Sequence, residues 1–347
     1  MINETYLYFR EDNQPKTVVT YTYNSKPTNH VVRKAHPKKI LKAAEEENVD
    51  FLTEVADQSW KGAERDLDWM AQVDKKGRAP IHLACIKGHI YIVRLIWRII
   101  SEYTRDIRTK ADFLNVTDNK GRTPLFYASA GGYLNICNYL LDRQADPDIV
   151  TNSYHESPGS TAMMVCAEKN RPDCFRLLMR KGADLIAKRK DGADAIYMAA
   201  RYGNHEVINI IATSKMFQLL VNRRSFHGRT ALVTAALHGH LEACKSLHAS
   251  GFDLDIQDND DFTALIYAAN AGHYLLVRWL VKTGANLYLK DRYGATALDI
   301  ARAHDFEEMS HFLENCHNDL ENRRNTVNLM KNSVNRALLK TKITVIK

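Results

Sequence analysis

The sequence predicts an all-α solenoid in which helix–turn–helix units are stacked side by side. Three observations predict it: the stretch 118–146 recurs along the chain, its turn residue returns at a regular spacing, and a pair of small residues follows at the same point of each unit. A unit of this size cannot bury its apolar face alone, so it is stable only when neighbouring units cover it.

The stretch 118–146 shows how one unit is built. Residues 118–121 have turn chemistry and end in Gly121, which adopts positive φ at no steric cost. Thr123 and Pro124 then suit the cap and the first position of a helix. Two glycines end that helix, and an apolar face at helical spacing predicts a second, longer helix from Leu134.

The other units are found by their turn residues, and three of the six successive spacings equal 33 residues. These turn residues are Gly77, Gly121, Gly159, Gly192, Gly228, Asp261 and Gly294. Together with a threonine that recurs two residues after most turn residues and the recurring Gly-His position, this pattern resembles the ankyrin-repeat family over residues 40–314. The resemblance implies helix pairs connected by finger-like hairpin turns, with a concave groove lined by the fingers and the first helices.

The sequence divides into three parts. Residues 1–38 do not fit the repeat, and their two runs of β-branched and aromatic residues, 5–9 and 17–23, predict a small β-hairpin-like extension. Residues 39–316 form the solenoid of about seven repeats plus a degenerate N-terminal capping repeat. Residues 317–347 are a basic, amphipathic C-terminal tail.

Composition fits a soluble, intracellular protein. Hydrophobic residues make up 45% and charged residues 26%, and the first residues contain no apolar stretch typical of a secretory signal. The formal net charge of +7 belongs to the tail, because seven basic residues and no acidic residue follow Glu321. The six cysteines mostly fall at core positions of the repeats and are interpreted as small apolar fillers in a reducing compartment.

Three departures from the 33-residue period mark where this chain differs from a regular array. The charged stretch 99–111 predicts a lengthened second helix, and 151–158 has loop composition and is expected beside the groove. In 214–220 an apolar cluster replaces the usual end of the second helix and is expected to fill the seam between repeats. For each insertion, a partner contact and neutral surface variation both remain open.

By the resemblance, a partner binds the fingers and the first helices. The early fingers are basic, whereas Asp258, Asp260 and Asp261 make a later one acidic. A partner segment with acidic or aromatic character is therefore expected, although a solvated charged rim explains any single residue equally well. The predicted partner-binding residues are Lys76, Arg78, Lys120, Arg122, Tyr154, His155 and Arg229.

The resemblance also assigns roles to histidines and asparagines. It gives the histidines of the first helix and of the turn between helices hydrogen bonds within and between repeats, rather than a metal-binding or catalytic role. These are His82, His89, His240 and His273. Asn115 and Asn222 lie six residues before a turn glycine, where ankyrin repeats can be hydroxylated on asparagine.

The tail carries an apolar stripe at a spacing of three and four residues, with basic residues largely off that stripe. The candidate tail-binding residues are Arg323, Arg324, Lys331 and Arg336. The stripe could cover the open end of the last repeat, dock into a partner groove, or bind an anionic membrane or nucleic acid.

No P-loop, nucleophile elbow, zinc-protease or kinase motif is present, and the repeats account for nearly all of the chain. The sequence therefore predicts a non-catalytic protein-interaction scaffold or adaptor without a cofactor or small-molecule substrate. It would act as a monomer or within a larger assembly, in the cytoplasm, the nucleus or on the cytoskeleton. Two alternatives are a structural component of a cytoskeletal or ciliary assembly, and attachment to anionic membrane or nucleic acid through the tail.

Overall fold

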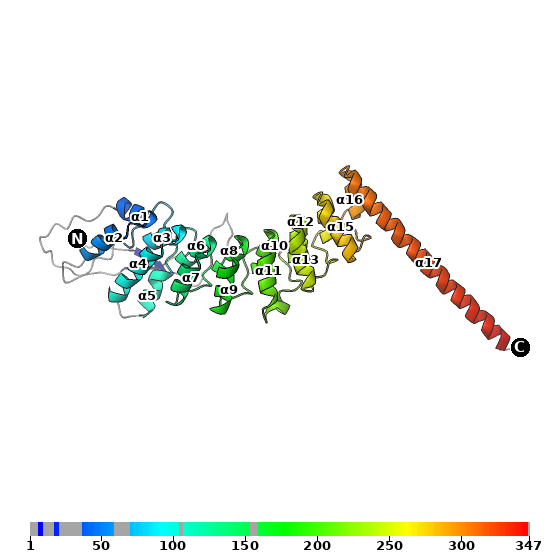
Figure 1. The fold of residues 1–347 in the computed structure, drawn as a ribbon, viewed down its shortest axis with the longest axis horizontal. Coiled ribbons are helices and arrows are strands. Elements are labelled where there is room, and N and C mark those ends of the chain that lie inside the picture. Colours follow the sequence, from blue (N-terminus) through cyan, green and yellow to red (C-terminus); the bar gives the residue numbers. More distant parts are fainter. Residues whose placement is uncertain are drawn as a thin grey trace. The chain divides into compact units, whose positions relative to one another are not determined.

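The computed structural model describes residues 6–9, 17–20, 37–58, 70–103, 107–152 and 159–345, with side chains over 38–57, 70–102, 110–152 and 159–325 and at Lys331. The chain divides into two compact units, residues 1–146 and 147–347, which are described one at a time. Within each unit, paired helices lie side by side in chain order (Figure 1). The prediction of stacked helix pairs is confirmed.

In the first unit, the first helices of successive pairs pack on one another, α1 on α3 and α3 on α6, while α2 packs on α4 and α4 on α7. Its helices are α1 (Pro37–Glu45), α2 (Val49–Gln58), α3 (Pro80–Lys87), α4 (Ile90–Tyr103), α5 (Ile107–Leu114), α6 (Pro124–Gly131) and α7 (Leu134–Leu141). The pair α1 and α2 occupies the place where the sequence predicts the capping repeat.

In the second unit the same rule holds, with α8, α10, α12, α14 and α16 forming the row of first helices. Its helices are α8 (Ala162–Glu168), α9 (Pro172–Arg180), α10 (Ala195–Arg201), α11 (His205–Ala212), η1 (Phe217–Leu219), α12 (Ala231–Leu237), α13 (Leu241–Ala249), α14 (Ala264–Asn270), α15 (Tyr274–Thr283), α16 (Ala297–Ala303) and α17 (Glu307–Val345).

The first unit also holds two short strands. β1 (Tyr6–Phe9) and β2 (Thr17–Thr20) pair antiparallel, with Tyr6 opposite Thr20 and Phe9 opposite Thr17. Residues 10–16 between them and 21–36 after them lie outside the described residues. Whether the two strands belong to a hairpin that covers the array therefore stays a prediction.

The charged stretch 99–111 does not simply lengthen one helix. The second helix α4 is long, at 14 residues, but it ends at Tyr103, and a separate helix α5 begins at Ile107. Residues 104–106 between them lie outside the described residues. Ile99, Ile100 and Leu114 are buried, so the insertion contributes side chains from both helices to the core.

The predicted N-caps hold most of the first helices. The capping oxygen accepts a hydrogen bond from the backbone N–H three residues later, which satisfies an amide that has no partner within the helix. This bond is made by Thr123, Thr161, Asp194, Thr230, Thr263 and Thr296. Ala79, before α3, has no capping oxygen, and there His82 Nδ1 accepts from the Ala79 amide at 3.0 Å instead.

Small residues let the first helices approach closely. The predicted small pairs are almost fully inaccessible, as at Ala199 and Ala200 of α10 or Ala268 and Ala269 of α14. Five of the six cysteines are buried thiols, and Cys316 is half-buried. The cysteines therefore pack as small apolar side chains, as the sequence predicts.

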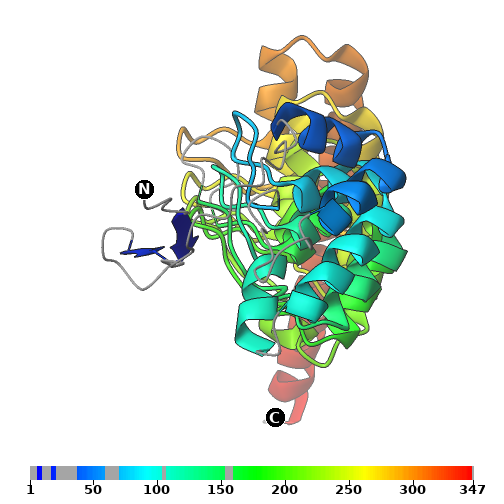
Figure 2. The same cartoon turned by 90° about the vertical axis from the view of Figure 1, so that its left-hand side faces the viewer.

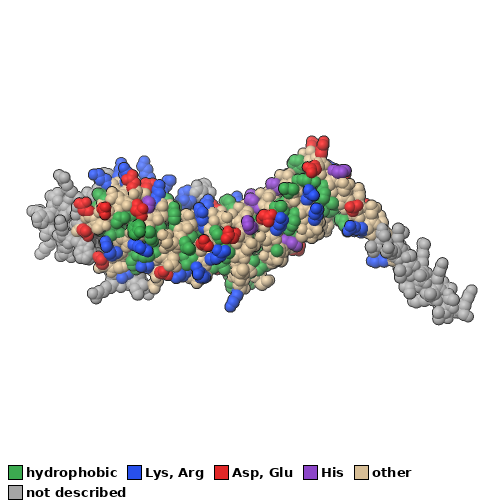
Figure 3. Space-filling view, in the orientation of Figure 1, with side chains coloured by type: hydrophobic (Ala, Val, Ile, Leu, Met, Phe, Trp, Pro, Cys, Tyr) green, Lys and Arg blue, Asp and Glu red, His purple; other side chains and the backbone are tan. Residues whose placement is uncertain are grey.

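The turn between the helices of a pair ties each repeat to the preceding one. His240 Nε2 lies 3.1 Å from the Arg201 carbonyl and His273 Nε2 lies 3.3 Å from the Leu237 carbonyl, both one repeat earlier. Gly203 has φ +73°, and a Cβ there would lie 2.7 Å from the His240 ring, so this turn needs glycine for both its conformation and its space. Histidine side chains accordingly gather over helices α10–α13 in Figure 3.

The apolar cluster 214–220 forms the short 3₁₀ helix η1. Phe217 and Leu220 are buried, and the Phe217 ring lies 6.2 Å from that of Phe252 in the next repeat. Met216 and Leu219 are exposed. The cluster thus fills the seam between repeats with half of its apolar side chains and leaves the other half at the surface.

The last repeat and the tail share one helix. α17 begins at Glu307 as the second helix of its pair and continues without a break to Val345, through the point where the sequence places the start of the tail. Met309 and Leu313 are buried against the array, whereas residues 318–325 are exposed. At 1.5 Å per residue, the helix is about 58 Å long.

Candidate partner-binding surface

The finger turns of the first unit are built around one carboxylate each. Asp118 Oδ1 accepts from the backbone amides of Lys120 (2.8 Å) and Arg122 (2.9 Å), and its Oδ2 accepts from the Tyr127 hydroxyl at 2.6 Å. Asp74 accepts in the same way from the amides of Lys76 and Arg78. A carboxylate that accepts several N–H groups fixes a turn firmly, because each bond is charge-assisted.

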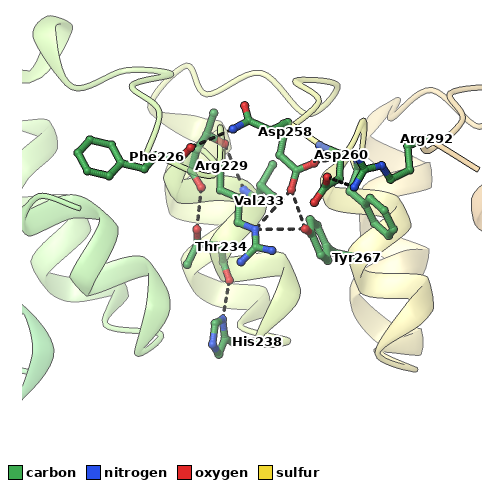
Figure 4. Close-up of polar contacts among 12 residues, drawn as sticks. Phe226, Arg229, Val233, Thr234, His238, Asp258, Asp260, Tyr267 and Arg292 are labelled. Carbon is green, nitrogen blue, oxygen red and sulfur yellow. Dashed lines mark hydrogen bonds and ion pairs between the residues drawn. The ribbon is translucent and has the colours of Figure 1, made fainter. Parts of the chain in front are cut away.

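The second unit repeats this design around Asp258, which is shown in Figure 4. Its Oδ1 accepts from the amides of Asp260 (2.9 Å) and Phe262 (3.0 Å), and its Oδ2 accepts from the Tyr267 hydroxyl at 2.6 Å. Arg229 Nε donates to the Tyr267 hydroxyl at 3.1 Å and lies 3.4 Å from the same carboxylate. Burial and the bond to Asp258 raise the pKa of Tyr267 to about 12.

Neighbouring finger tips are joined by backbone hydrogen bonds. In the first unit, the Asn119 amide donates to the Lys76 carbonyl at 3.0 Å. In the second unit, the amides of Phe226, Asn259 and Arg292 donate to the carbonyls of Asp191, His227 and Asp260, respectively. Each finger is therefore placed by its neighbour, and within a unit the tip side chains form a row. In the end-on view the loops of the second unit project to one side of its helices (Figure 2).

The structure gives the predicted basic residues of the first unit two different roles. Lys76 is exposed at its finger tip, and Lys120 is half-buried on the next. Arg78 pairs with Asp74, with Nε 2.7 Å from Oδ2. Arg122 lies over the rings of Phe126 and Tyr127, at 5.8 and 5.9 Å from their centroids. The two arginines thus contribute to their own turns, while the lysine tips are placed side by side by the backbone bond.

The other predicted partner-binding residues are Arg229, Tyr154 and His155. Arg229 belongs to the second unit and is engaged with Asp258 and Tyr267, with its guanidinium 5.1 Å from the Tyr267 ring centroid. Tyr154 and His155 lie outside the described residues. The set as a whole stays a prediction.

Sequence reasoning missed two exposed aromatic tips in the second unit. Phe226 is 70% exposed and Tyr293 is 80% exposed. Phe226 lies two residues before the turn residue Gly228, and Tyr293 lies directly before the turn residue Gly294. The finger between them carries Asp260, whose carboxylate pairs with Arg292 at 2.5 Å. The sequence alone indicates this exposure, because an aromatic residue at the tip of a turn cannot reach the core.

The histidines form structural hydrogen bonds, as the resemblance implies. His82 is fully buried, and its Nε2 lies 3.1 Å from the carbonyls of Val116 and of Arg122 in the next finger. Burial lowers the pKa of His82 to about 4, against a smaller raising effect of Asp118. Across the described part of the chain, no group of three or more His, Cys, Asp or Glu side chains is arranged to hold a metal ion.

The two asparagines predicted as hydroxylation sites link successive repeats. Asn115 Oδ1 accepts from the Asp146 amide at 2.9 Å, and Asn222 Oδ1 accepts from the Asp253 amide at 3.2 Å. Asp255 makes the equivalent bond to the Asn286 amide. The position is therefore a structural link between repeats, and its modification stays a prediction.

The predicted tail residues all lie on α17. Arg323 and Arg324 are exposed, and the Arg324 guanidinium lies 4.5 Å from the Tyr288 ring centroid. Lys331 is exposed, and the side chain of Arg336 lies outside those described. Among the helices of the described ranges, none combines the length and apolar character needed to cross a membrane.

Comparison with known proteins decides the family. The family model described as ankyrin repeats (3 copies) matches residues 40–151, 109–188, 146–219, 163–258, 209–291 and 232–324. The chain belongs to the ankyrin-repeat family. Ankyrin repeats are typically protein-interaction modules and usually non-catalytic.

Known ankyrin-repeat proteins resemble this array at a distance. B-cell lymphoma 3 protein from Homo sapiens is 26% identical over 242 residues, covering 69% of this chain and 50% of that protein. The transient receptor potential cation channel subfamily A member 1 homolog from Caenorhabditis elegans is 27% identical over 219 residues, covering 62% of this chain and 17% of that protein. The chain thus spans half of the first relative and a smaller part of the second.

Proposed function

We propose that this ankyrin-repeat chain is a non-catalytic scaffold or adaptor that binds a protein partner through its finger turns and first helices. The observation that supports the proposal is the row of finger tips, whose carboxylate-centred turns and backbone bonds hold Lys76 and Lys120 side by side in the first unit. Rigid presentation lowers the ordering cost of binding, so tip residues can contribute most of their interaction energy to affinity.

The proposed partner segment is acidic, with aromatic residues. Lys75 and Lys76 are exposed on one finger, and the neighbouring finger carries Lys120. Complementary charge at such a rim increases the association rate and selects the partner. Arg78 and Arg122 support this surface indirectly, because they stabilise the turns that carry the lysines.

We extend the proposal to the organisation of the chain and to its location. Residues 1–38 form a small hairpin-like extension, 39–316 the array, and 317–347 a tail that continues its last helix. Location in the cytoplasm follows from the role of an intracellular adaptor.

The test compares two charge-matched variants of the full chain. Lys76→Glu with Lys120→Glu reverses both finger tips, whereas Arg94→Glu with Arg98→Glu reverses two exposed charges on the second helix α4. Proteins that co-purify with wild type are quantified by mass spectrometry for each variant. The finger variant is expected to lose specific partners that the control variant retains.

The design avoids a false result from unfolding. Arg78 and Arg122 are left intact because their replacement would loosen the turns themselves. A thermal stability equal to that of wild type in both variants establishes that both are folded. Unchanged partner sets in the finger variant would remove the assignment of the binding surface to these fingers.

A further inference from the structure

The longest helix, α17, carries a stripe at alternating spacings of four and three residues that is apolar except at Arg323. Met309, Leu313, Cys316 and Leu320 belong to it, and the sequence continues the same register through Val327, Met330, Val334 and Ala337. A 3.5-residue repeat of apolar positions along a helix is the pattern of a coiled-coil seam.

The array uses only the first part of this stripe. Leu313 is 1% exposed, but Leu320, two turns further along the same face, is 37% exposed. Beyond it, residues 321–325 are exposed, and the helix backbone still continues to Val345. Most helical stability in proteins comes from packing of an apolar face, so a partner that covers the rest of this stripe would stabilise the helix.

Charge decides what covers the rest of the stripe. Arg323 occupies a seam position, at the spacing between Leu320 and Val327, and Arg324 and Lys331 occupy a flanking position. No acidic residue follows Glu321. A second copy in parallel register would place Arg323 against its own equivalent, which is unfavourable in a seam, and an acidic helix would neutralise it.

The width of the stripe favours a partner helix over a membrane surface as the occupant of this face. A helix that lies on a membrane needs a broad apolar face, whereas the seam positions here form a narrow stripe. Between residues 325 and 335 the outer positions are four asparagines and one leucine, with no lysine or arginine among them: Asn325, Asn328, Leu329, Asn332 and Asn335.

We propose that α17 beyond the last repeat is a second binding site, separate from the fingers, and that its occupant is an acidic amphipathic helix of another protein. The partner helix pairs its apolar seam with Leu320, Val327, Met330, Val334 and Ala337, and it places an acidic residue opposite Arg323. The chain would then hold two partners, one on the fingers and one on the tail helix.

The test uses the full chain and two designed peptides with identical leucine seams. The acidic peptide carries glutamate at the flanking positions and opposite Arg323, and the basic peptide carries lysine there; vesicles containing phosphatidylserine are the third probe. Binding is followed by fluorescence anisotropy for the peptides and by co-sedimentation for the vesicles. Wild type is expected to bind the acidic peptide at least about tenfold more tightly than the basic one.

Matched variants separate the seam from charge alone. Val327→Asp with Val334→Asp places two negative charges in the seam, and Asn328→Asp with Asn335→Asp places them one position away. The seam variant is expected to lose about tenfold or more in affinity for the acidic peptide, and the control less than about threefold. Arg323→Glu, which leaves the apolar seam intact, is expected to shift preference towards the basic peptide.

Four outcomes would overturn the proposal. They are equal weakening by the seam and control variants, no change of preference in Arg323→Glu, wild type that binds vesicles but neither peptide, and wild-type self-association that the seam variant abolishes. The fingers are unaltered in these variants, so a failure here leaves the finger surface untouched.

Discussion

Two fingers of the second unit have the same turn conformation but carry side chains of opposite charge at the equivalent position. At Asp258, a carboxylate accepts two backbone amides and the Tyr267 hydroxyl. At the equivalent point of an earlier finger stands Arg189, which is also buried, pairs with Asp191 at 3.2 Å and donates to Met198 Sδ at 3.3 Å.

The backbone hydrogen bond of the turn is the same in both fingers. The Asp258 amide donates to the Phe262 carbonyl at 3.0 Å, and the Arg189 amide donates to the Ala193 carbonyl at 2.8 Å. In the Arg189 finger, Asp191 Oδ1 accepts one amide, from Ala193, where Asp258 accepts two. The repeat therefore sets the shape of the turn, and the side chain at this position sets how strongly the turn is held.

The largest effect is expected from Asp258→Ala. Removing the carboxylate leaves two amides and the Tyr267 hydroxyl without their acceptor and Arg229 without its ion-pair partner, and the free energy of unfolding should fall by about 3 kcal/mol. Urea unfolding followed by circular dichroism measures it. A loss no larger than that of Arg189→Leu would break the comparison.

The free energy of unfolding is expected to depend on pH through His82, which bonds to the turn built around Asp118. In the first unit, His82 bonds to the carbonyl of Arg122 in the Asp118 finger, and its folded pKa of about 4 lies below its ordinary value of 6.5. Above pH 6.5 both states are neutral. Between 6.5 and 4 only the unfolded chain gains the proton, so stability falls as pH falls, by about 2 kcal/mol from pH 7 to pH 5.

The matched variant for this effect is His82→Gln, which keeps polar groups at the position but cannot titrate. Urea midpoints at several pH values should show a shallower loss on acidification for the variant than for wild type. Parallel curves for the two proteins would contradict the role of His82.

A smaller loss is expected from Tyr267→Phe. The carboxylate of Asp258 keeps its two amides and Arg229, so only one hydroxyl bond is removed, which should cost about 1 kcal/mol. The same urea experiment measures it, with Tyr127→Phe as the counterpart at Asp118 in the first unit. A loss as large as that of Asp258→Ala would mean that the hydroxyl, rather than the carboxylate, holds the turn.

The smallest effect is expected from Arg189→Leu. The arginine Nε has no hydrogen-bond partner among the described residues, so replacing this buried group with an apolar one removes little net stabilisation. The free energy of unfolding should change by less than about 1 kcal/mol. A loss above about 2 kcal/mol would show that the Arg189 turn is held as firmly as the Asp258 turn.

Much of the fold was predictable because local signals repeat. Turn glycines, Thr caps and small pairs each act within a few residues, and Thr123 and Thr263 cap their helices as their positions indicate. The break between α4 and α5 and the continuity of α17 were not predicted, because they depend on packing over longer distances than a local pattern reports.

The candidate surface was predictable in part. Asp74 precedes Arg78 by four residues, a spacing that already indicates the side-chain pair between them, and Asp118 precedes Arg122 by the same spacing and accepts from its backbone amide. The partners of Arg229 lie 29 and 38 residues further along the chain and required the stacked repeats to be seen.

Hydrogen–deuterium exchange of the full chain with and without a captured partner tests most directly whether the fingers and first helices form the binding surface. Exchange in the partner complex is expected to be slower at finger residues 74–78 and 118–122, with no change in α4 and α7. Protection confined to α4 and α7, with the fingers unchanged, would contradict it.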